Sequence, residues 1–323
     1  MDQDEGLEGI YKQIELAGKT CYKSEGTITK DSAKAFVDKM IKNGHYSMLE
    51  HGTVYLTFRT TENDYLYMHA KEYIANKYSE VRYDTVRYNV LTGRVHKVWG
   101  KGPMCIFYIT TNYRVLVEND WLQDLMYLTP PTSFHYKRTT YRITTSRAVS
   151  HELVRHRVFS FAQESTRYCN YAGQKFDGQL TFIKPSYIKH PFGDVECKYE
   201  DGTWRCMPID RPDEVFNTGI CGDKDTASNL FLWGLQNDET YYLRLINEFN
   251  VKPEDARMIL PNSLKTEVIM TGFNDDWDRF LQLRYFESTG KVSPDMKEIA
   301  ERICFYDNVN LMHFNTNEKT KDA

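Results

Sequence analysis

The most informative stretch of this chain is RHRVFSFAQESTR, which runs from Arg155 to Arg167. It brings three arginines, a histidine and several hydroxyl side chains into thirteen residues. A guanidinium is planar and permanently charged, and it can hold a phosphate or the edge of a flat ring through two hydrogen bonds. The hydroxyls of Ser165 and Thr166 could add neutral donors. The stretch therefore predicts a site for an anionic ligand, although a solvated basic helix end is the simpler alternative.

Charge along the chain favours the binding interpretation. The residues from Lys137 to Tyr168 contain seven cations against two acids, a local net charge of +5. The whole chain has 41 Lys and Arg against 45 Asp and Glu, a net charge of −4. A basic stripe this confined in an acidic protein suits a small phosphate or nucleotide better than a nucleic acid.

Composition excludes several classes of protein. With 323 residues and 41% hydrophobic content, the chain can bury a substantial core and is not disordered. The acidic start MDQDEG does not resemble a signal peptide, and no apolar stretch is long enough for a membrane span. Seven cysteines without a CxxC pair favour reduced thiols, so we expect a soluble, cytoplasmic protein.

His151 and His156 are five residues apart, which does not fit a metal pair on one helix face, and we predict no metal.

Hydrophobic periodicity predicts the elements before and after the basic stretch. A helix is expected over 31–43 with Gly44 as its stop, and a half-buried strand over 53–60 with Val54, Leu56 and Phe58 on one face. Further strands are expected at 104–110 and 139–145, and Ser146 can cap a helix that continues to about 158. Later helices are expected over 227–250, over 254–272 with an interruption near Pro261, over 275–286 and over 293–305. A glycine-rich phosphate loop is absent from the sequence.

The chain resembles the flavin-dependent thymidylate synthases. Arg155-His156-Arg157 followed after seven residues by Ser165 matches that family's signature. Three other segments resemble the family in the same order along the chain: Gly44-His45 through Glu50-His51, ARMILPN at 256–262, and FLQLR at 280–284. The resemblance lapses at about 62–136 and 185–225, which we interpret as insertions into a single domain spanning 1–323.

The resemblance implies a fold, a reaction and an assembly. The fold would be α/β of the α+β type, an antiparallel or mixed sheet packed with long helices. The reaction would be the reductive methylation of dUMP to dTMP, in which methylenetetrahydrofolate gives the carbon and NADPH reduces bound FAD. The assembly would be a homotetramer with its sites between subunits, without nucleic-acid or membrane partners.

The resemblance also assigns site residues, position by position. Arg284 would be catalytic, because a guanidinium beside the pyrimidine stabilises the negative charge that develops when hydride reaches C6. The residues implied for FAD are His45, Ser47, Glu50, Arg155, His156, Arg157, Gln163, Asn274 and Arg279. The residues implied for dUMP are Glu152, Arg155, Gln163, Glu164, Ser165, Thr166, Arg167, Arg257 and Arg284.

The chain departs from the family pattern near the predicted cofactor. Phe273-Asn274-Asp275 replaces a common Asn-x-Arg, and Arg279 stands where Asn or His is usual. Glu152 replaces a common Gln, and Ala162-Gln163 replaces an Asn-Glu pair. All the arginines are retained, so the departures bear on how FAD is held more than on the reaction.

Other interpretations of single residues and of the whole chain remain. Cys169 is better explained as a small buried residue than as a nucleophile, Ser165 is better explained as a donor than as a nucleophile, and His51 could be either packed or a ligand. A related flavin-dependent enzyme that transfers one carbon to another pyrimidine nucleotide is one alternative function. A protein that binds nucleic acid through the basic, Tyr-rich stretch at 137–171 is the other.

Overall fold

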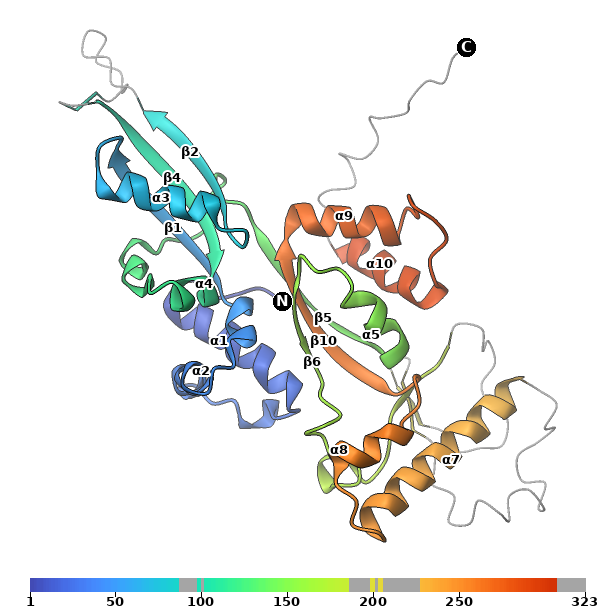
Figure 1. The fold of residues 1–323 in the computed structure, drawn as a ribbon. Coiled ribbons are helices and arrows are strands. Elements are labelled where there is room, and N and C mark those ends of the chain that lie inside the picture. Colours follow the sequence, from blue (N-terminus) through green and yellow to red (C-terminus); the bar gives the residue numbers. More distant parts are fainter. Residues whose placement is uncertain (87–97, 100–101, 186–197, 201–202, 206–226, 307–323) are drawn as a thin grey trace, which may run out of the picture. The chain divides into compact units, whose positions relative to one another are not determined.

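The computed structural model describes residues 1–86, 98–99, 102–185, 198–200, 203–205 and 227–306 (Figure 1). The chain divides into two compact units. Unit 1 contains residues 1–142, 157–164 and 268–274, and unit 2 contains residues 143–156, 165–267 and 275–323. Two strands, at residues 138–146 and 265–273, therefore each pass from one unit into the other along the chain.

Unit 1 holds most of the strands. Its helical elements are α1 (Gly6–Cys21), η1 (Glu25–Thr27), α2 (Ser32–Lys42), η2 (Tyr46–His51), α3 (Tyr65–Ala75), α4 (Tyr113–Glu118) and η3 (Leu122–Tyr127). Its strands are β1 (Thr53–Thr61), β2 (Glu80–Val86), β3 (Val98–Trp99), β4 (Gly102–Asn112) and β6 (Ser160–Gln163), with parts of β5 (Arg138–Ser146) and β10 (Lys265–Phe273).

The first sheet of unit 1 has the order β1-β4-β2, and β3 pairs with β4. The strands β1 and β4 are antiparallel, with Leu56 opposite Ile109 and Phe58 opposite Phe107. These four side chains are buried in one core with Ala70 and Tyr73 of α3. Figure 1 shows α3 lying across this sheet. Alternating apolar residues bury one face of a strand, so the strands predicted at 53–60 and 104–110 are confirmed.

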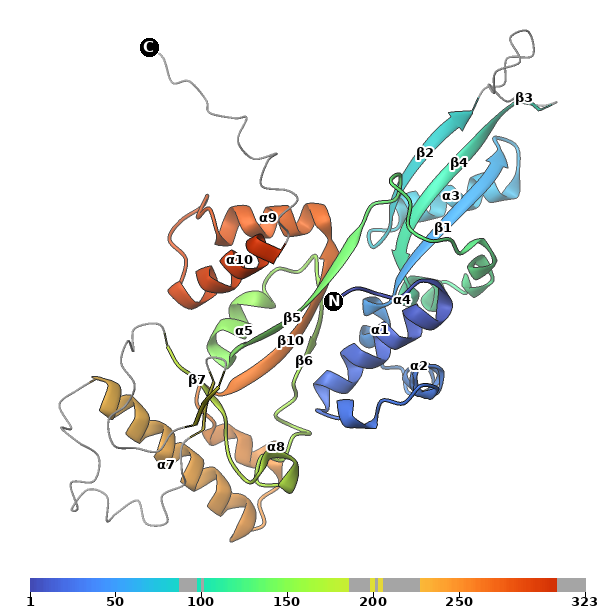
Figure 2. The same cartoon turned by 180° about the vertical axis from the view of Figure 1, so that it is seen from behind.

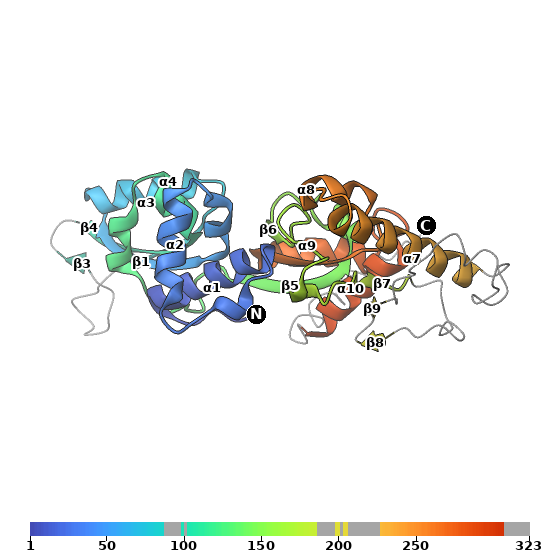
Figure 3. The same cartoon turned by 90° about the horizontal axis from the view of Figure 1, so that it is seen from below.

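Helices α1 and α2 pack against each other in unit 1 (Figure 3). Their approach depends on Gly18, because a Cβ at that position would lie 2.4 Å from the ring of Phe36. The helix predicted over 31–43 is confirmed as α2. Gly44 follows it at φ +69°, a left-handed conformation that glycine adopts without strain and that ends the helix.

The second sheet has the order β5-β10-β6. In unit 1, β10 and β6 are antiparallel, with Ile269 opposite Ala162. The prediction of a helix over 254–272 is wrong for its second half, because only α8 (Pro253–Ala256) and η5 (Arg257–Ile259) precede the strand β10. Seven consecutive residues of β10 are buried, and a strand buried on both faces lacks the alternation that identifies half-buried strands.

Unit 2 is mostly helical. It contains α5 (Arg147–Leu153), η4 (Gln174–Phe176), α7 (Ala227–Asn247), α8, η5, α9 (Asn274–Arg284, from Asp275) and α10 (Pro294–Tyr306). A small sheet of order β7-β9-β8 is formed by β7 (Phe182–Ile183), β8 (Lys198–Glu200) and β9 (Thr203–Arg205). Helices α7 and α8 lie side by side (Figures 1 and 3), and Leu235, Tyr242 and Ala256 contribute to their common core.

Several predicted helices of unit 2 are confirmed with altered ends. The helices predicted at 227–250, 275–286 and 293–305 correspond to α7, α9 and α10. The Ser146 side chain accepts a hydrogen bond from the Val149 N–H, which confirms it as the N-cap of α5. That helix stops at Leu153 rather than near 158, so the Arg-His-Arg triplet lies in a turn after the helix.

The structure combines helices with sheets, and the strand pairs described above are antiparallel. This confirms the predicted fold class. The described residues of the segment 62–136 supply α3, β2 and the central strand β4 of the first sheet. Most of the segment 185–225 lies outside the described residues. Among the helices that are described, none combines the length and the apolar character needed to cross a lipid bilayer.

Candidate active site

The clearest polar cluster of unit 2 surrounds Arg284, the last residue of α9. Its Nε donates to Nε2 of His156 at 3.0 Å, and its Nη1 lies 3.4 Å from a carboxylate oxygen of Glu152. The other oxygen of Glu152 accepts a hydrogen bond from the Ser293 hydroxyl at 2.9 Å. The side chain of Arg284 keeps 21% of its surface exposed. The guanidinium is thus held by two partners, and the side chain stays partly accessible.

His156 is held neutral in this cluster. Burial lowers its pKa to about 4, and the nearby positive charges of Arg284 and Arg155 act in the same direction. Because Nε2 accepts from Arg284, the single proton of the neutral ring lies on Nδ1. The edge of the ring packs against Phe280 with 4.9 Å between ring centroids.

Three further arginines of unit 2 are available for anions. Arg155, Arg257 and Arg279 are exposed, and none of their guanidinium groups forms an ion pair or hydrogen bond with another described residue. Unpaired guanidiniums at the surface offer several donors each to a phosphate or diphosphate.

Arg167 is engaged differently. Its Nε lies 3.1 Å from a carboxylate oxygen of Glu254, and this contact raises the pKa of Arg167. The ion pair joins Arg167 to α8, the helix that leads directly to Arg257. Both side chains of the pair are about half exposed, so a phosphate could displace Glu254 at little cost.

Ser165 and Thr166 lie in the turn that leads to Arg167. The carbonyl of Ser165 accepts hydrogen bonds from the N–H groups of Tyr168 and Cys169. Ser165 is half-buried and Thr166 is buried. Cys169 is buried among apolar side chains such as Tyr171 and Leu180, which agrees with its interpretation as a small core residue.

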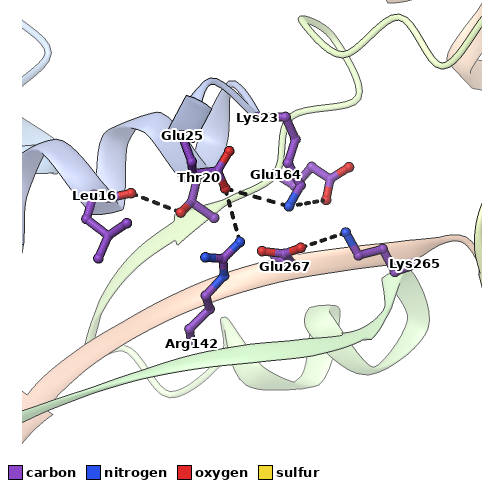
Figure 4. A network of polar contacts seen from close by, with 8 residues as sticks. All are labelled: Leu16, Thr20, Lys23, Glu25, Arg142, Glu164, Lys265 and Glu267. Atoms are coloured by element: carbon purple, nitrogen blue, oxygen red, sulfur yellow. Dashed lines mark hydrogen bonds and ion pairs between the residues drawn. The ribbon is translucent and has the colours of Figure 1, made fainter. Parts of the chain in front are cut away.

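In unit 1, Glu164 belongs to a charged network at the end of β6 (Figure 4). Its carboxylate is buried and lies 3.7 Å from Nζ of Lys23, which also contacts Glu25 at 3.8 Å. Glu25 in turn pairs with Arg142 at 3.1 Å. The backbone of Lys23 has φ +49°, an uncommon conformation for a residue with a side chain. These ion pairs hold Glu164, near the end of the stretch 155–167, in place.

His45 is the N-cap of η2 and the residues up to Glu50 lie on η2, which packs against β6 in unit 1. Met48 contacts the small apolar cluster that includes Ala162 and Ile269, so this segment and the Gln163 strand are neighbours. His45 and Ser47 are exposed. Glu50 accepts a hydrogen bond from Arg114 at 2.5 Å, and its backbone carbonyl accepts from Arg138 at 3.1 Å.

Three other predicted cofactor residues belong to unit 1. Gln163 lies opposite Val268 in the sheet. Asn274 accepts a hydrogen bond from the Thr139 hydroxyl at 2.7 Å, which fixes the end of β10 against β5. Arg157 is exposed and has no ion pair with any residue in the described ranges.

His51 is a packed residue rather than an exposed ligand. Its Nδ1 is 2.8 Å from the Thr271 hydroxyl, which also contacts the hydroxyl of Thr140. Burial lowers the pKa of His51 to about 3, with a further contribution from the charge of Arg138. Its Nε2 is buried without a hydrogen-bond partner among the described residues.

The structure thus gathers the predicted residues into two groups, one in each unit. Unit 2 brings together Glu152, His156 and Arg284, and unit 1 places the His45–Glu50 segment beside the Gln163 strand. The sequence pattern does not identify Ser293, Lys23 or Arg114 as partners of Glu152, Glu164 and Glu50. They are separated from their partners by 141, 141 and 64 positions, and no local pattern signals such contacts.

Comparisons with known proteins identify the family of the chain. The family model described as thymidylate synthase complementing protein matches residues 101–305, more than half of the chain. A flavin-dependent thymidylate synthase of Geobacter sulfurreducens is 28% identical over 142 residues, which are 44% of this chain and 45% of that protein. Another from Corynebacterium efficiens is 27% identical over 167 residues, in an alignment that covers 47% of this chain and 51% of that protein. The chain spans about half the length of these curated relatives.

Two solved structures are also similar. Thymidylate synthase X from Helicobacter pylori, determined with FAD and dUMP, gives a TM-score of 0.31 at 18% identity over 51% of this chain and 65% of that chain. A UMP/dUMP methylase, PolB from Streptomyces cacaoi, bound with 5-Br dUMP, gives a TM-score of 0.36 at 12% identity over 95% of this chain and 88% of that chain.

Proposed function

Because the chain belongs to the thymidylate synthase complementing protein family, we propose that it is a flavin-dependent thymidylate synthase that methylates dUMP to dTMP. The observation that carries this proposal is the guanidinium of Arg284, held between Glu152 and the neutral ring of His156. A positive charge fixed in this way requires little reorganisation when negative charge develops beside it. A guanidinium fixed in this geometry is better suited to stabilising a transition state than to attracting a charged substrate without orienting it.

The side chains present suit FAD. A diphosphate needs several donors, and Arg155 and Arg279 in unit 2 and Arg157 in unit 1 are exposed and without ion pairs among the described residues. In our proposal each of these arginines contributes to binding FAD, and so do His156, Asn274 and the segment that contains His45, Ser47 and Glu50. Gln163 adds an amide that can donate or accept. FAD, when bound, supplies the hydride for the reduction.

The remaining residues of the site bind dUMP in our proposal. Arg257 and Arg167 bind its phosphate, and the latter exchanges Glu254 for the substrate. Ser165 and Thr166 add hydroxyl donors, and Glu164 anchors the loop through Lys23. Arg284 donates to a carbonyl oxygen of the pyrimidine and stabilises negative charge on the ring. Neutral His156 accepts a hydrogen bond from Arg284 and so maintains its orientation.

Methylenetetrahydrofolate as the carbon donor and NADPH as the reductant complete the proposal. The test is an omission series with purified protein, in which dTMP is quantified by mass spectrometry. We expect dTMP only when dUMP, FAD, NADPH and methylenetetrahydrofolate are all present. Formation of dTMP without FAD, or no product from the complete mixture, would contradict the proposal.

A further inference from the structure

A cavity of about 580 Å³ lies in unit 1 on the face of the β1-β4-β2 sheet opposite α3, the face seen in Figure 2. Its floor is formed by Thr57 and Arg59 of β1 and by Tyr108 of β4. Its wall is the segment 126–134, which follows β4 and α4 in the chain. The volume is within the range of small-molecule sites. None of these residues belongs to the site proposed for FAD or dUMP.

The wall of the cavity is held in place by hydrogen bonds to the sheet. The Thr129 N–H donates to the Tyr55 carbonyl at 3.0 Å, and Leu128 forms a β-bridge with Leu56. The buried ring of His135 donates from Nε2 to the Leu56 carbonyl at 3.0 Å, while its Nδ1 accepts from the Thr132 N–H at 3.1 Å. Burial lowers the pKa of His135, which favours this neutral arrangement. The cavity is therefore formed before any ligand arrives.

The cavity presents a flat aromatic surface. The rings of Tyr108 and Phe134 are stacked, with centroids 4.8 Å apart and planes 19° apart. Phe134 is 51% exposed and Met126 is 76% exposed, although both are large apolar residues. A third ring can extend such a stack, and a flexible methionine can adapt to its edge.

Arg59 adds an uncompensated positive charge at the same place. It lies opposite Ile106 in the sheet register and is exposed to solvent. Across the ranges that the structure describes, no carboxylate pairs with its guanidinium and no hydrogen bond occupies that group. The hydroxyls of Thr57, Thr132 and Ser133 also line the cavity.

From these observations we propose that the cavity binds a planar aromatic anion, that is, a flat ring system carrying a phosphate or a carboxylate. The ring would stack on Phe134 and the anion would pair with Arg59. Nucleoside phosphates and folate-type carboxylates share this chemistry. The proposal does not depend on the proposed reaction, because none of its residues takes part in that site.

The test measures binding by isothermal titration calorimetry to the full chain, with FAD and dUMP present in excess so that their proposed sites are occupied. The probes are AMP and p-aminobenzoylglutamate, which distinguish the two sources of the anion, and adenosine, which lacks the charge. We expect at least one of the two anions, AMP or p-aminobenzoylglutamate, to bind. If AMP binds, adenosine should bind at least ten times more weakly than AMP does. Failure of both anions to bind would overturn the proposal.

Two variants and a control localise the site. Arg59→Met and Phe134→Leu should each weaken binding of the anion about tenfold or more, because they remove the charge and the ring separately. Arg302→Met, an exposed arginine on α10, should leave binding unchanged. The proposal would be overturned if Arg59→Met and Phe134→Leu bound the anion as tightly as Arg302→Met does. So would a change in molecular mass by light scattering in Arg59→Met, since the face would then be a contact between subunits.

Discussion

At the residue scale, the orientation of Arg284 depends on a chain of two hydrogen-bonded neighbours. Ser293 donates to one oxygen of Glu152, and the other oxygen faces the guanidinium. A carboxylate that loses one partner can rotate, so the position of Arg284 depends on a serine that needs no contact with the substrate. Ser293 is in this sense a positioning residue.

We therefore expect Ser293→Ala to lower kcat about threefold to tenfold, since a hydrogen bond to a charged group contributes about 1.5–3 kcal/mol at most. The Michaelis constant for dUMP should change less, and Ser293→Thr should restore most of the activity. Steady-state kinetics measure both quantities. Ser288→Ala in the same loop is the control, because the exposed Ser288 side chain makes no contact with the cluster. Identical kcat values in the Ser293 and Ser288 variants would refute the positioning role.

Also at the residue scale, His51 should make stability depend on pH. Its pKa is lowered to about 3 in the folded protein from an ordinary value of 6.5. The unfolded chain therefore takes up a proton that the folded protein refuses, so stability is complete above about pH 6.5 and decreases as the pH falls toward 3.

Between pH 7 and pH 5, the free energy of unfolding should fall by about 1–2 kcal/mol more in the wild type than in His51→Gln. Urea unfolding at both pH values measures this difference. The comparison of slopes does not require the two proteins to be equally stable. Parallel pH dependence in the two proteins would show that His51 is not held neutral.

At the scale of elements, β10 and the turn after Arg157 fit together because Gly272 has no side chain. A Cβ there would lie 2.3 Å from the ring of Phe159, closer than any real contact. Overpacking of a well-packed site costs about 1–3 kcal/mol. We expect Gly272→Ala to destabilise the protein by this amount, measured by thermal or urea unfolding.

The second variant in this test is Gly272→Ala combined with Phe159→Leu, which should recover part of the loss by making room. Gly234→Ala is the control, because a Cβ on that exposed helix position meets nothing within 4 Å. It should be neutral or stabilise the protein by about 0.4–1 kcal/mol. If Gly272→Ala behaves like Gly234→Ala, the packing of β10 against Phe159 is not tight.

The same elements show how far the sequence predicts the fold. β1, α2 and α7 follow from apolar residues at period 2 or 3.6, because each has one exposed side. The sequence pattern predicts a helix where β10 lies, because this strand is buried on both faces and has no such period. The signature stretch predicts the arginines of the site, but the contacts of Glu152, Glu164 and Glu50 are made by distant residues that local patterns do not identify.

At the scale of the whole molecule, assembly is the property that remains a prediction. Several large apolar side chains are highly exposed in the isolated chain, among them Met258 at 85% next to Arg257. Exposed apolar surface of this kind often marks a contact between subunits. We expect a homotetramer of about 152 kDa, four times the chain mass of 38.0 kDa.

Light scattering measures this mass directly. Met258→Glu should shift the protein toward smaller species and lower its activity together, because a buried carboxylate opposes association. A monomer with full activity would contradict both the tetramer and the proposal that the sites need more than one subunit.

The central claim is that Arg284 activates dUMP for methylation in a flavin-dependent reaction. The most direct measurement mixes reduced, FAD-loaded protein anaerobically with dUMP and methylenetetrahydrofolate, and follows flavin absorbance and dTMP in a single turnover. We predict that the wild type oxidises its flavin and forms dTMP together. Arg284→Ala, with its FAD occupancy confirmed, should be slower by about 100-fold or more. Flavin oxidation without dTMP in the wild type, or a variant rate within a few fold of the wild type, would contradict the claim.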